Sequence, residues 1–256
     1  IREIDSSEHL APLFAEGKMM GVLIAEDKDG NLVTLKGFSG SIGGQGCLDG
    51  FVPPIFDLTH PGGYYRIHEQ KISDLNQEIA VLETQEVRPL SAAILEAVQS
   101  RDMELERLRE EKKKASCIKE SQFANGEIKR AKDRWKEMIS TKEAELHEIK
   151  ERLNSLKRLR AGMSDQLQRW IFGQYIVHNA AGEQSSILEI FTSQGLMPPG
   201  GTGDCAAPKL LNYAFIKGLK PVAMGEFWYG KSPDTAVRTH GHFYPSCTSK
   251  CGPLLA

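Results

Sequence analysis

The sequence contains no long run of apolar residues. Its longest uncharged stretches are broken by glycine, proline or polar residues, and none approaches the roughly 20 apolar residues that a membrane-spanning helix requires. Basic residues are not in excess, because 32 Lys and Arg side chains oppose 34 Asp and Glu side chains, which gives a formal net charge of −2. This balance excludes a protein surface that is basic throughout and binds nucleic acid everywhere. Local clusters of basic residues are still compatible with the small net charge.

Cysteine is also sparse. The chain has five cysteines in 256 residues, an odd number that favours free thiols or metal ligands over a disulfide framework. We therefore expect a reducing compartment, the cytoplasm. A hydrophobic content of 40% is sufficient for at least one sizeable core, which excludes collagen, low-complexity disorder and a disulfide-stabilised miniprotein.

Glycine, proline and aromatic residues are nearly missing from the middle of the chain. A single glycine, Gly126, lies between residues 64 and 161, and no proline lies between Pro89 and Pro198. Phe123 and Trp135 are the only aromatic residues between Tyr65 and Trp170. Such a segment is typical of long helices that pack as a coiled coil rather than as a globular core.

The apolar spacing of this segment agrees with a coiled coil. Apolar residues recur at near-heptad spacing in two runs, Ile72 to Leu82 and Leu146 to Trp170. Residues 115–127 interrupt the pattern between the runs, and Asn125-Gly126 within this stretch is a strong turn signal. We predict an antiparallel hairpin with helices near residues 67–114 and 127–172. Pro89 should kink or interrupt the first helix, because proline removes a backbone donor.

The segments on either side resemble a compact module of strands and helices. Asp29-Gly30 lies between the apolar runs 21–25 and 32–35 and predicts a β-hairpin. Asp204 can cap a helix that extends to about Lys217, and residues 221–229 have the pattern of a buried strand. The predicted fold class is α+β, with a mixed sheet and flanking helices. Residues 1–66 and 173–256 form the compact domain, and residues 67–172 form the inserted coiled coil.

A group of possible metal ligands occurs near the C-terminus and in a glycine-rich loop. Cysteine and histidine are the ligands that zinc prefers, and Cys205 stands where a helix N-terminus lowers the pKa of a thiol. We predict that three cysteines share one zinc, with a histidine or water as the fourth ligand. The alternative is a set of buried or free thiols with hydrogen-bonded histidines. The candidates are Cys205, Cys247, Cys251, His240 and His242. Cys47 and Cys117 are not expected to take part.

The glycine-rich loop at 201–203 admits other interpretations. Its glycines can serve tight packing alone, and a phosphate-binding loop is disfavoured because the paired Lys-Ser/Thr of a P-loop is absent. Zinc-dependent nucleobase deaminases are a further comparison, because they combine a Cys or His near a glutamate with a Pro-Cys-x-x-Cys motif. This chain departs from that pattern at two places. Ala207 occupies the position of the glutamate, and Cys247 and Cys251 are one residue too far apart. Glu226, on the neighbouring strand, could replace the missing carboxylate.

Positive charge is concentrated around the predicted turn of the hairpin. Nine Lys and Arg residues oppose three acidic residues between positions 112 and 136, a local net charge of +6 against −8 for the remainder. RNA phosphates would be attracted to such a cluster, whereas a solvated helix face is the alternative interpretation. The predicted RNA-binding residues are Lys112, Lys113, Lys114, Lys129, Arg130, Lys132 and Arg134.

Several strings, spread over almost the whole chain, resemble the long N-terminal extension of RluA-type RNA pseudouridine synthases. They are Gly17–Leu23, Phe38–Gly40, Gly50–Asp57, Gly203–Leu211, Glu226–Gly230 and His240–Pro245. The resemblance implies a partner RNA, tRNA or rRNA, and a catalytic domain in the same polypeptide, which isomerises uridine without a cofactor. In that family the nucleophilic Asp lies in an Arg-Leu-Asp motif, and this sequence contains no such motif. No catalytic residue is therefore assigned, and we expect the protein to continue beyond Ala256.

The preferred hypothesis is an accessory, RNA-positioning region of a pseudouridine synthase that is inactive by itself. A zinc-dependent deaminase-like domain, active or degenerate, and a module for protein–protein interaction are the alternatives. Metal content separates the deaminase-like domain from the others, and salt-dependent RNA binding separates an RNA-positioning region from a protein-binding module.

Overall fold

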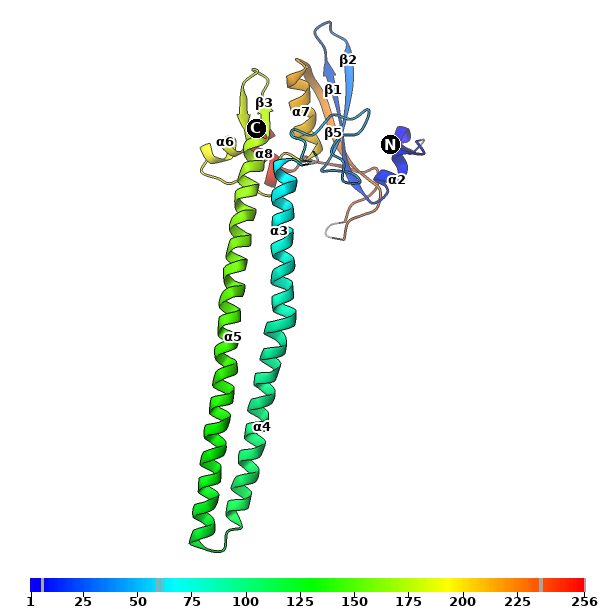
Figure 1. Ribbon diagram of the computed structural model, residues 1–256. Coiled ribbons are helices and arrows are strands. Elements are labelled where there is room, and N and C mark those ends of the chain that lie inside the picture. Colours follow the sequence, from blue (N-terminus) through cyan, green and yellow to red (C-terminus); the bar gives the residue numbers. More distant parts are fainter. Residues whose placement is uncertain (6, 59, 61, 235–236, 256) are drawn as a thin grey trace. The chain divides into compact units, whose positions relative to one another are not determined.

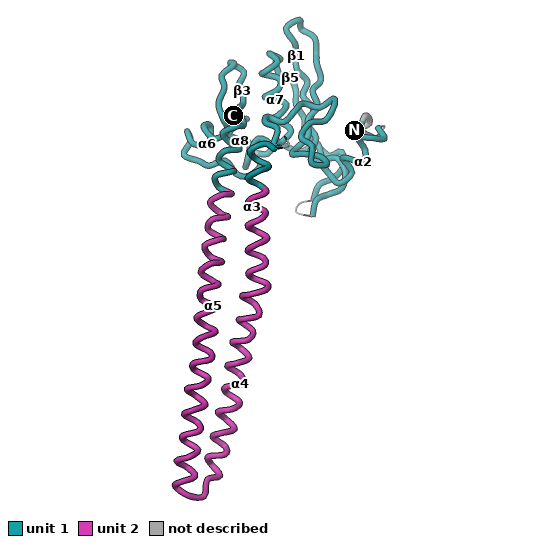
Figure 2. Tube along the Cα trace, in the orientation of Figure 1, with its two compact units in different colours: residues 1–69, 165–256 teal, residues 70–164 magenta. Residues whose placement is uncertain are grey.

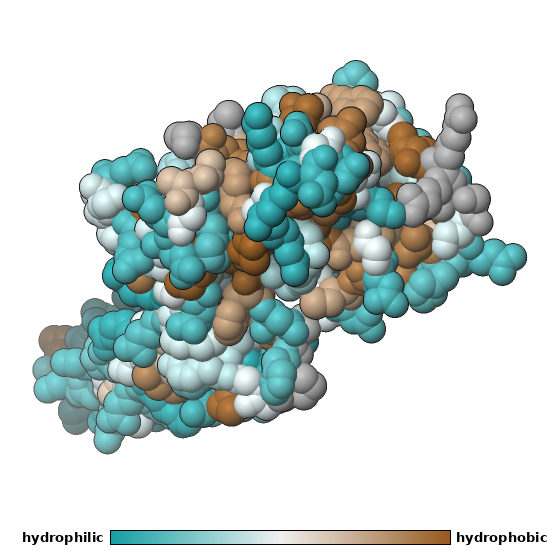
Figure 3. Space-filling model, turned by 90° about the horizontal axis from the view of Figure 1, so that it is seen from above, coloured by the Kyte–Doolittle hydropathy of each residue, from teal (hydrophilic) through white to brown (hydrophobic). Residues whose placement is uncertain are grey.

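The computed structural model describes residues 1–5, 7–58, 60, 62–234 and 237–255. The chain divides into two compact units (Figure 2). Residues 1–69 and 165–256 form unit 1, and residues 70–164 form unit 2. The described residues include no helix that is both long and apolar enough to cross a membrane. In the view from above, hydrophobic residues form small separate patches among hydrophilic ones (Figure 3).

Unit 1 is built on a four-stranded sheet with the strand order β2-β1-β5-β6 (Figure 1). The strands are β1 (Lys18–Glu26), β2 (Leu32–Phe38), β5 (Lys220–Tyr229) and β6 (Phe243–Tyr244). Helices and an inserted hairpin accompany this sheet, so the predicted α+β class is confirmed. Every pairing in the sheet is antiparallel, however, and the predicted mixed sheet is wrong. The sheet is purely antiparallel because β5 runs antiparallel to β1. The local sequence of β5 does not indicate the direction in which this strand pairs.

The predicted hairpin of β1 and β2 is confirmed. A carboxylate oxygen of Asp27 accepts hydrogen bonds from the backbone N–H groups of Asp29 at 2.9 Å and Asn31 at 2.8 Å. Gly30 has φ +83°, a left-handed conformation that glycine adopts at little cost. The side chain of Asp27 therefore stabilises the turn that sets the register of both strands.

Different cores cover the two faces of the sheet. Helix α7 (Ala206–Ile216) packs Leu210 and Ala214 against Leu23 and Ala25. Aromatic residues dominate the other core, together with residues from the short helices α1 (Arg2–Asp5) and α2 (Leu10–Phe14). Its buried members are Ile4, Phe14, Met20, Phe38, Ile42, Phe227 and Tyr229. The C-terminal half of β5 is buried and most of its N-terminal half is exposed, so the prediction of a buried strand holds for part of it.

A third core lies around the C-terminal end of the long helix α5 (Ile118–Gln174). Phe172 and Tyr175 pack with Ile187 and Phe191. The surrounding elements are β3 (Ile176–His178), β4 (Gln184–Ser186), α6 (Ile187–Ser193) and α8 (Thr248–Leu255). Ser186 and Glu189 form a reciprocal capping box at the start of α6, so the local sequence specifies where this helix begins.

Unit 2 is the predicted antiparallel helical hairpin. Its first arm contains α3 (Tyr64–Val81), a π-helical segment η1 (Leu82–Val87) and α4 (Arg88–Lys113), and its second arm is α5. Ion pairs join the arms, from Glu78 to Arg152 at 2.9 Å and from Glu104 to Arg134 at 2.7 Å. The apolar seam buries Leu82, Ala97, Leu105, Ala131, Ile139 and Leu153.

Two local signals were predicted to interrupt the hairpin helices, Pro89 and Asn125-Gly126, and only the first does so. The α-helical hydrogen bonding is interrupted just before Pro89, as predicted, because η1 supplies a wider turn where proline cannot donate. The predicted turn at Asn125-Gly126 is wrong, since both residues lie inside α5. The chain reverses over 114–117, at the start of the predicted break, and there the backbone N–H and hydroxyl of Ser116 donate to the Glu120 carboxylate. The second helix therefore begins at 118 and not near 127.

Candidate functional site

Cys205 is the N-cap residue of α7. The prediction that Asp204 caps this helix is therefore wrong by one residue. Asp204 instead accepts a 2.8 Å hydrogen bond from the hydroxyl of Tyr175 through Oδ1. The prediction that this helix N-terminus lowers the pKa of Cys205 is wrong, because the hydrogen bond with Cys251 and burial raise the pKa of that thiol.

The structure brings two of the predicted cysteines together. The thiols of Cys205 and Cys251 are hydrogen-bonded to each other, and Cys251 also accepts hydrogen bonds from the backbone N–H groups of Gly203 and Cys205. Cys247 and Glu226 are close enough for their charges to act on Cys205. Cys205 at the N-cap of α7 and Cys251 in α8 thus meet, Cys251 being buried and Cys205 and Cys247 partly buried. We call this group the thiol cluster: Cys205, Cys247, Cys251 and Glu226.

Hydrogen bonding makes the two paired thiols unequal. The hydrogen bond from Cys205, helped by the two backbone N–H groups, lowers the pKa of Cys251 to about 7 although burial opposes this shift. The same hydrogen bond raises the pKa of Cys205, and burial and the neighbouring negative charges add to that effect. The pair therefore favours a thiolate on Cys251 and a proton on Cys205. Thiolate sulfur is the form that attacks electrophiles and binds zinc.

Glu226 is the buried carboxylate of the cluster. Its side chain is 5% exposed, and Oε1 accepts a 3.1 Å hydrogen bond from the backbone N–H of Ala207. Residue 207 is the position at which the deaminase pattern has its glutamate. A carboxylate from β5 thus reaches the first turn of α7, where the sequence itself has alanine.

The two candidate histidines have other contacts. Nδ1 of His240 accepts a 3.0 Å hydrogen bond from the N–H of Gly230, and its ring centroid lies 4.7 Å from that of Tyr229. The ring of His242 lies 5.1 Å from that of Tyr244. Among the described residues, no group of three or more His, Cys, Asp or Glu side chains has an arrangement that could hold a metal ion.

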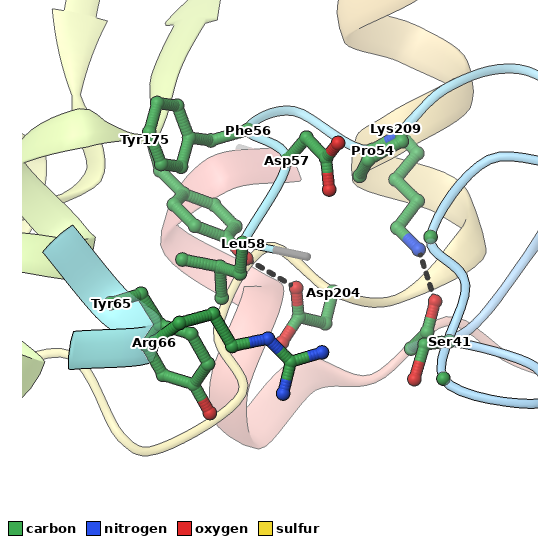
Figure 4. Close-up of a pocket in the computed structure, with 13 residues that line it drawn as sticks. Ser41, Pro54, Phe56, Asp57, Leu58, Tyr65, Arg66, Tyr175, Asp204 and Lys209 are labelled. Atoms are coloured by element: carbon green, nitrogen blue, oxygen red, sulfur yellow. Dashed lines mark hydrogen bonds between the residues drawn. The ribbon is translucent and has the colours of Figure 1, made fainter. Parts of the chain in front are cut away.

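A cavity with polar and apolar lining residues lies beside the N-terminal part of α7 (Figure 4). Its volume is ≈ 280 Å³, and Asp204 and Lys209 from the α7 region line it together with Phe56, Tyr65 and Arg66. Further lining residues are Gly40, Ser41, Gly44, Gly46, Pro54, Asp57, Leu58 and Tyr175. Glycines in the 40–46 loop, the 54–58 segment and the start of α3 therefore meet around one hollow.

Lys209 is a buried cation in the cavity. Its side chain is 3% exposed, and Nζ donates to the backbone carbonyls of Phe38 at 3.1 Å and Gly40 at 2.8 Å. Burial lowers the pKa of Lys209, and the charge of Asp204 partly opposes this shift. Burial likewise raises the pKa of Asp204, against the hydrogen bond from Tyr175 and the charge of Lys209. The two groups thus support each other's charged forms.

Close packing accounts for one glycine of the glycine-rich loop, Gly203. It has φ +88°, and a Cβ at this position would lie 2.5 Å from Cδ1 of Ile187 and 3.0 Å from Cδ1 of Tyr175. This residue is therefore glycine because the loop packs tightly against the third core, as the simpler interpretation of the sequence holds.

The predicted RNA-binding residues are distributed around the turn of the hairpin, but not all of them are unpaired. Lys113, Arg130 and Arg134 form ion pairs with Glu110, Glu127 and Glu104 of the same hairpin. The described residues contain no ion-pair partner for six further cations near the turn. We call these six the tip lysines: Lys112, Lys114, Lys119, Lys129, Lys132 and Lys136.

Comparisons of the chain with protein-family models, with curated proteins and with solved structures found no match. Tyr65, Arg66 and Tyr175 of the cavity had no signal in the sequence, because each belongs to or follows a long helix whose pattern indicates only a coiled coil. Asp204 and Lys209 could be noticed within the glycine-rich segment, but their common cavity could not.

Proposed function

We propose that this chain is an accessory RNA-binding region of an RNA pseudouridine synthase, without the catalytic Asp motif of that reaction. The observation that supports RNA binding is the set of tip lysines, whose side chains form no ion pair among the described residues, unlike Lys113, Arg130 and Arg134. The assignment to a pseudouridine synthase rests on the sequence resemblance described above. A catalytic domain of the same polypeptide would then act on the tRNA or rRNA that the hairpin holds, in the cytoplasm.

Phosphate contacts would explain the position of these charges. Each lysine that neutralises a phosphate releases condensed counterions, so binding strengthens at low salt without any reading of base sequence. An arginine that is already paired, such as Arg134 with Glu104, is expected to contribute less to phosphate binding, because the carboxylate balances its charge within the hairpin. The tip lysines, rather than the paired arginines, are therefore the groups that we expect to bind RNA.

Reversing four tip lysines provides the test. We expect the combined change Lys112→Glu, Lys114→Glu, Lys129→Glu and Lys132→Glu to weaken tRNA binding by about 10²–10³-fold and to reduce the salt slope by about 3–4. The loss should be similar for every RNA sequence, because phosphates carry no base information. Fluorescence anisotropy with labelled tRNA at several salt concentrations measures both quantities.

The matched control carries the same charge change farther along the same hairpin, at Lys71, Lys142, Lys150 and Arg158. If the control weakens binding as much as the tip variant, net charge alone accounts for the effect. If neither variant alters affinity or salt slope, the hairpin does not bind RNA and a protein partner becomes the better hypothesis.

A second candidate function is supported by the thiol cluster. We propose that it can bind zinc as a deaminase-like site, because Cys251 has a stabilised thiolate and Cys205 touches it. Cys247 would have to approach these two sulfurs to supply a third ligand, and His240, His242 or water would supply the fourth. Bound zinc would supply an activated water, and Glu226 would stand in for the glutamate missing at Ala207.

Metal content tests this second function directly. Full-length protein dialysed against zinc should retain about one ion per chain, and both Cys205→Ser and Cys251→Ser should lose it, because a neutral hydroxyl is a poor zinc ligand. Cys117→Ser, in the exposed turn of the hairpin, serves as the control and should retain zinc. Elemental analysis gives the ratio. Equal zinc content in all four proteins would exclude the thiol cluster as the site.

A further inference from the structure

Two residues that line the cavity beside α7, Lys209 and Asp204, offer a hydrogen-bond donor and an acceptor. Nζ of Lys209 donates two of its three hydrogens to the carbonyls of Phe38 and Gly40 and lies 5.2 Å from the centroid of the Phe38 ring, while the third hydrogen has no acceptor oxygen among the described residues. Oδ1 of Asp204 accepts from Tyr175, while no described residue donates to Oδ2. A ligand that contacts both groups would offer an acceptor to Lys209 and a donor to Asp204, which a carbonyl oxygen next to an N–H group can do.

Three aromatic residues, Phe56, Tyr65 and Tyr175, are part of the cavity lining. Phe56 lies against Trp170 with a centroid distance of 5.8 Å and against Tyr175 at 6.3 Å, so its ring has fixed neighbours. Tyr65 contributes another aromatic ring to the lining. Planar ligands gain from such rings by stacking, and the volume of ≈ 280 Å³ lies at the lower limit of ordinary ligand pockets. The volume therefore admits a ligand about as large as one small planar ring system.

Arg66 supplies the remaining feature. Its side chain is exposed, lines the cavity, and forms no ion pair among the described residues. Figure 4 shows Arg66, Asp204 and Lys209 reaching toward the same space. A guanidinium group in this position is suited to a phosphate, which it can bind through two parallel hydrogen bonds.

We propose that this cavity binds a nucleotide whose base has a keto–imino edge, uracil or guanine. The base carbonyl accepts from Nζ of Lys209, the ring N–H donates to Oδ2 of Asp204, and the phosphate contacts Arg66. The proposal rests on the RNA-binding function above in one respect, which is that an unpaired nucleotide of RNA is the expected source of the base. Cytosine and adenine present an amino group and a ring nitrogen without hydrogen. Their amino group would face the donor Lys209, and their ring nitrogen would face the acceptor Asp204, so neither hydrogen bond would form.

Calorimetric titration of the full chain with UMP, GMP, CMP and AMP tests the base preference. We expect UMP and GMP to bind about 10-fold or more tightly than CMP and AMP, the size of effect that one well-matched hydrogen-bonded pair provides. Asp204→Asn should shift the preference from UMP toward CMP, because an amide can donate to the bare nitrogen of cytosine. Single-stranded oligo(U) and oligo(A) show whether RNA carries the same preference as the free nucleotides.

Arg66→Ala tests the phosphate contact and leaves Lys209 and Asp204 intact. It should weaken UMP binding by about 10-fold and leave uridine binding unchanged, because uridine lacks the phosphate. Lys220→Ala, another exposed cation of unit 1, is the control and should change neither. Circular dichroism of each variant verifies its fold, and Arg66→Ala keeps the proposal testable if Asp204→Asn does not fold.

Failure of this proposal can be distinguished from failure of the RNA-binding function. Absence of nucleotide binding at millimolar concentration, or equal binding of all four nucleotides that Arg66→Ala does not alter, overturns the cavity proposal even if the tip variants weaken RNA binding. Base-selective nucleotide binding together with unaltered RNA affinity of the tip variants supports a site for free nucleotides and overturns the RNA-binding function of the hairpin.

Discussion

Gly230→Ala is expected to lower the unfolding free energy of unit 1 by about 4 kcal/mol or more, a loss that only the most destabilising single substitutions reach. Gly230 has φ +89°, and a Cβ there would lie 2.4 Å from the carbonyl oxygen of Phe14 and 2.7 Å from that of Ala15. The same Cβ would lie 2.8 Å from the backbone nitrogen of Gly17. These are backbone atoms, which cannot move aside as the end of a flexible side chain can. Urea denaturation followed by near-ultraviolet circular dichroism measures the loss.

Gly182→Ala is the matched control for this prediction. Gly182 has φ +83°, nearly the value at Gly230, but a Cβ there meets no described atom within 4 Å. It should therefore cost only the conformational penalty of a left-handed alanine, about 1–2 kcal/mol. If the two variants lose equal stability, the close approach of residues 14–17 to Gly230 does not matter and the structural explanation is wrong.

Phe14→Ala is expected to cost about 3–5 kcal/mol of unfolding free energy, because it opens a cavity in the aromatic core. Phe14 is 0% exposed. Its ring centroid lies 5.9 Å from that of Phe38, 5.7 Å from that of Phe51 and 6.1 Å from that of Tyr229. These neighbours belong to β2, to β5 and to a loop, so the space cannot close without moving several elements. The same denaturation experiment gives the value.

Phe243→Ala supplies the comparison for Phe14. Phe243 is 66% exposed and contacts Phe227 from the short strand β6 at a centroid distance of 5.8 Å. Its removal loses one cross-strand aromatic contact and leaves little cavity, so we expect a cost of about 1 kcal/mol or less. A loss at position 243 as large as the loss at position 14 would contradict the assignment of the aromatic core.

The two arms of the hairpin could be predicted because their signal is local and repeated. A near-heptad apolar pattern, together with the lack of glycine and proline, specifies a helix whatever its partner is. The exact turn could not be predicted in the same way. Asn125-Gly126 favours a turn by itself, but continuous pairing of the arms as far as 114–117 extends α5 through it. Many small packing terms along the arms outweighed one local preference.

The thiol cluster was accessible to sequence reasoning only as a list of suitable residues. Chemistry selects Cys205, Cys247 and Cys251 from the five cysteines, because they lie near a helix start or near one another in sequence. The hydrogen bond between Cys205 and Cys251 joins residues 46 positions apart and depends on how α7 and α8 pack. His240 contacts Tyr229 because the chain after β5 returns to the end of that strand, whereas His242 contacts Tyr244 only two residues farther along the chain.

The sequence by itself determined the helical hairpin, the β1–β2 hairpin and the concentration of positive charge near residues 112–136, because each follows from residues close together along the chain. The tertiary structure decided the direction of β5, the approach of Glu226 to Ala207, and the meeting of Arg66, Asp204 and Lys209 around one cavity. These features join residues that are far apart in sequence. Their contacts depend on the simultaneous packing of several elements, and no local pattern records which distant surfaces will bury each other.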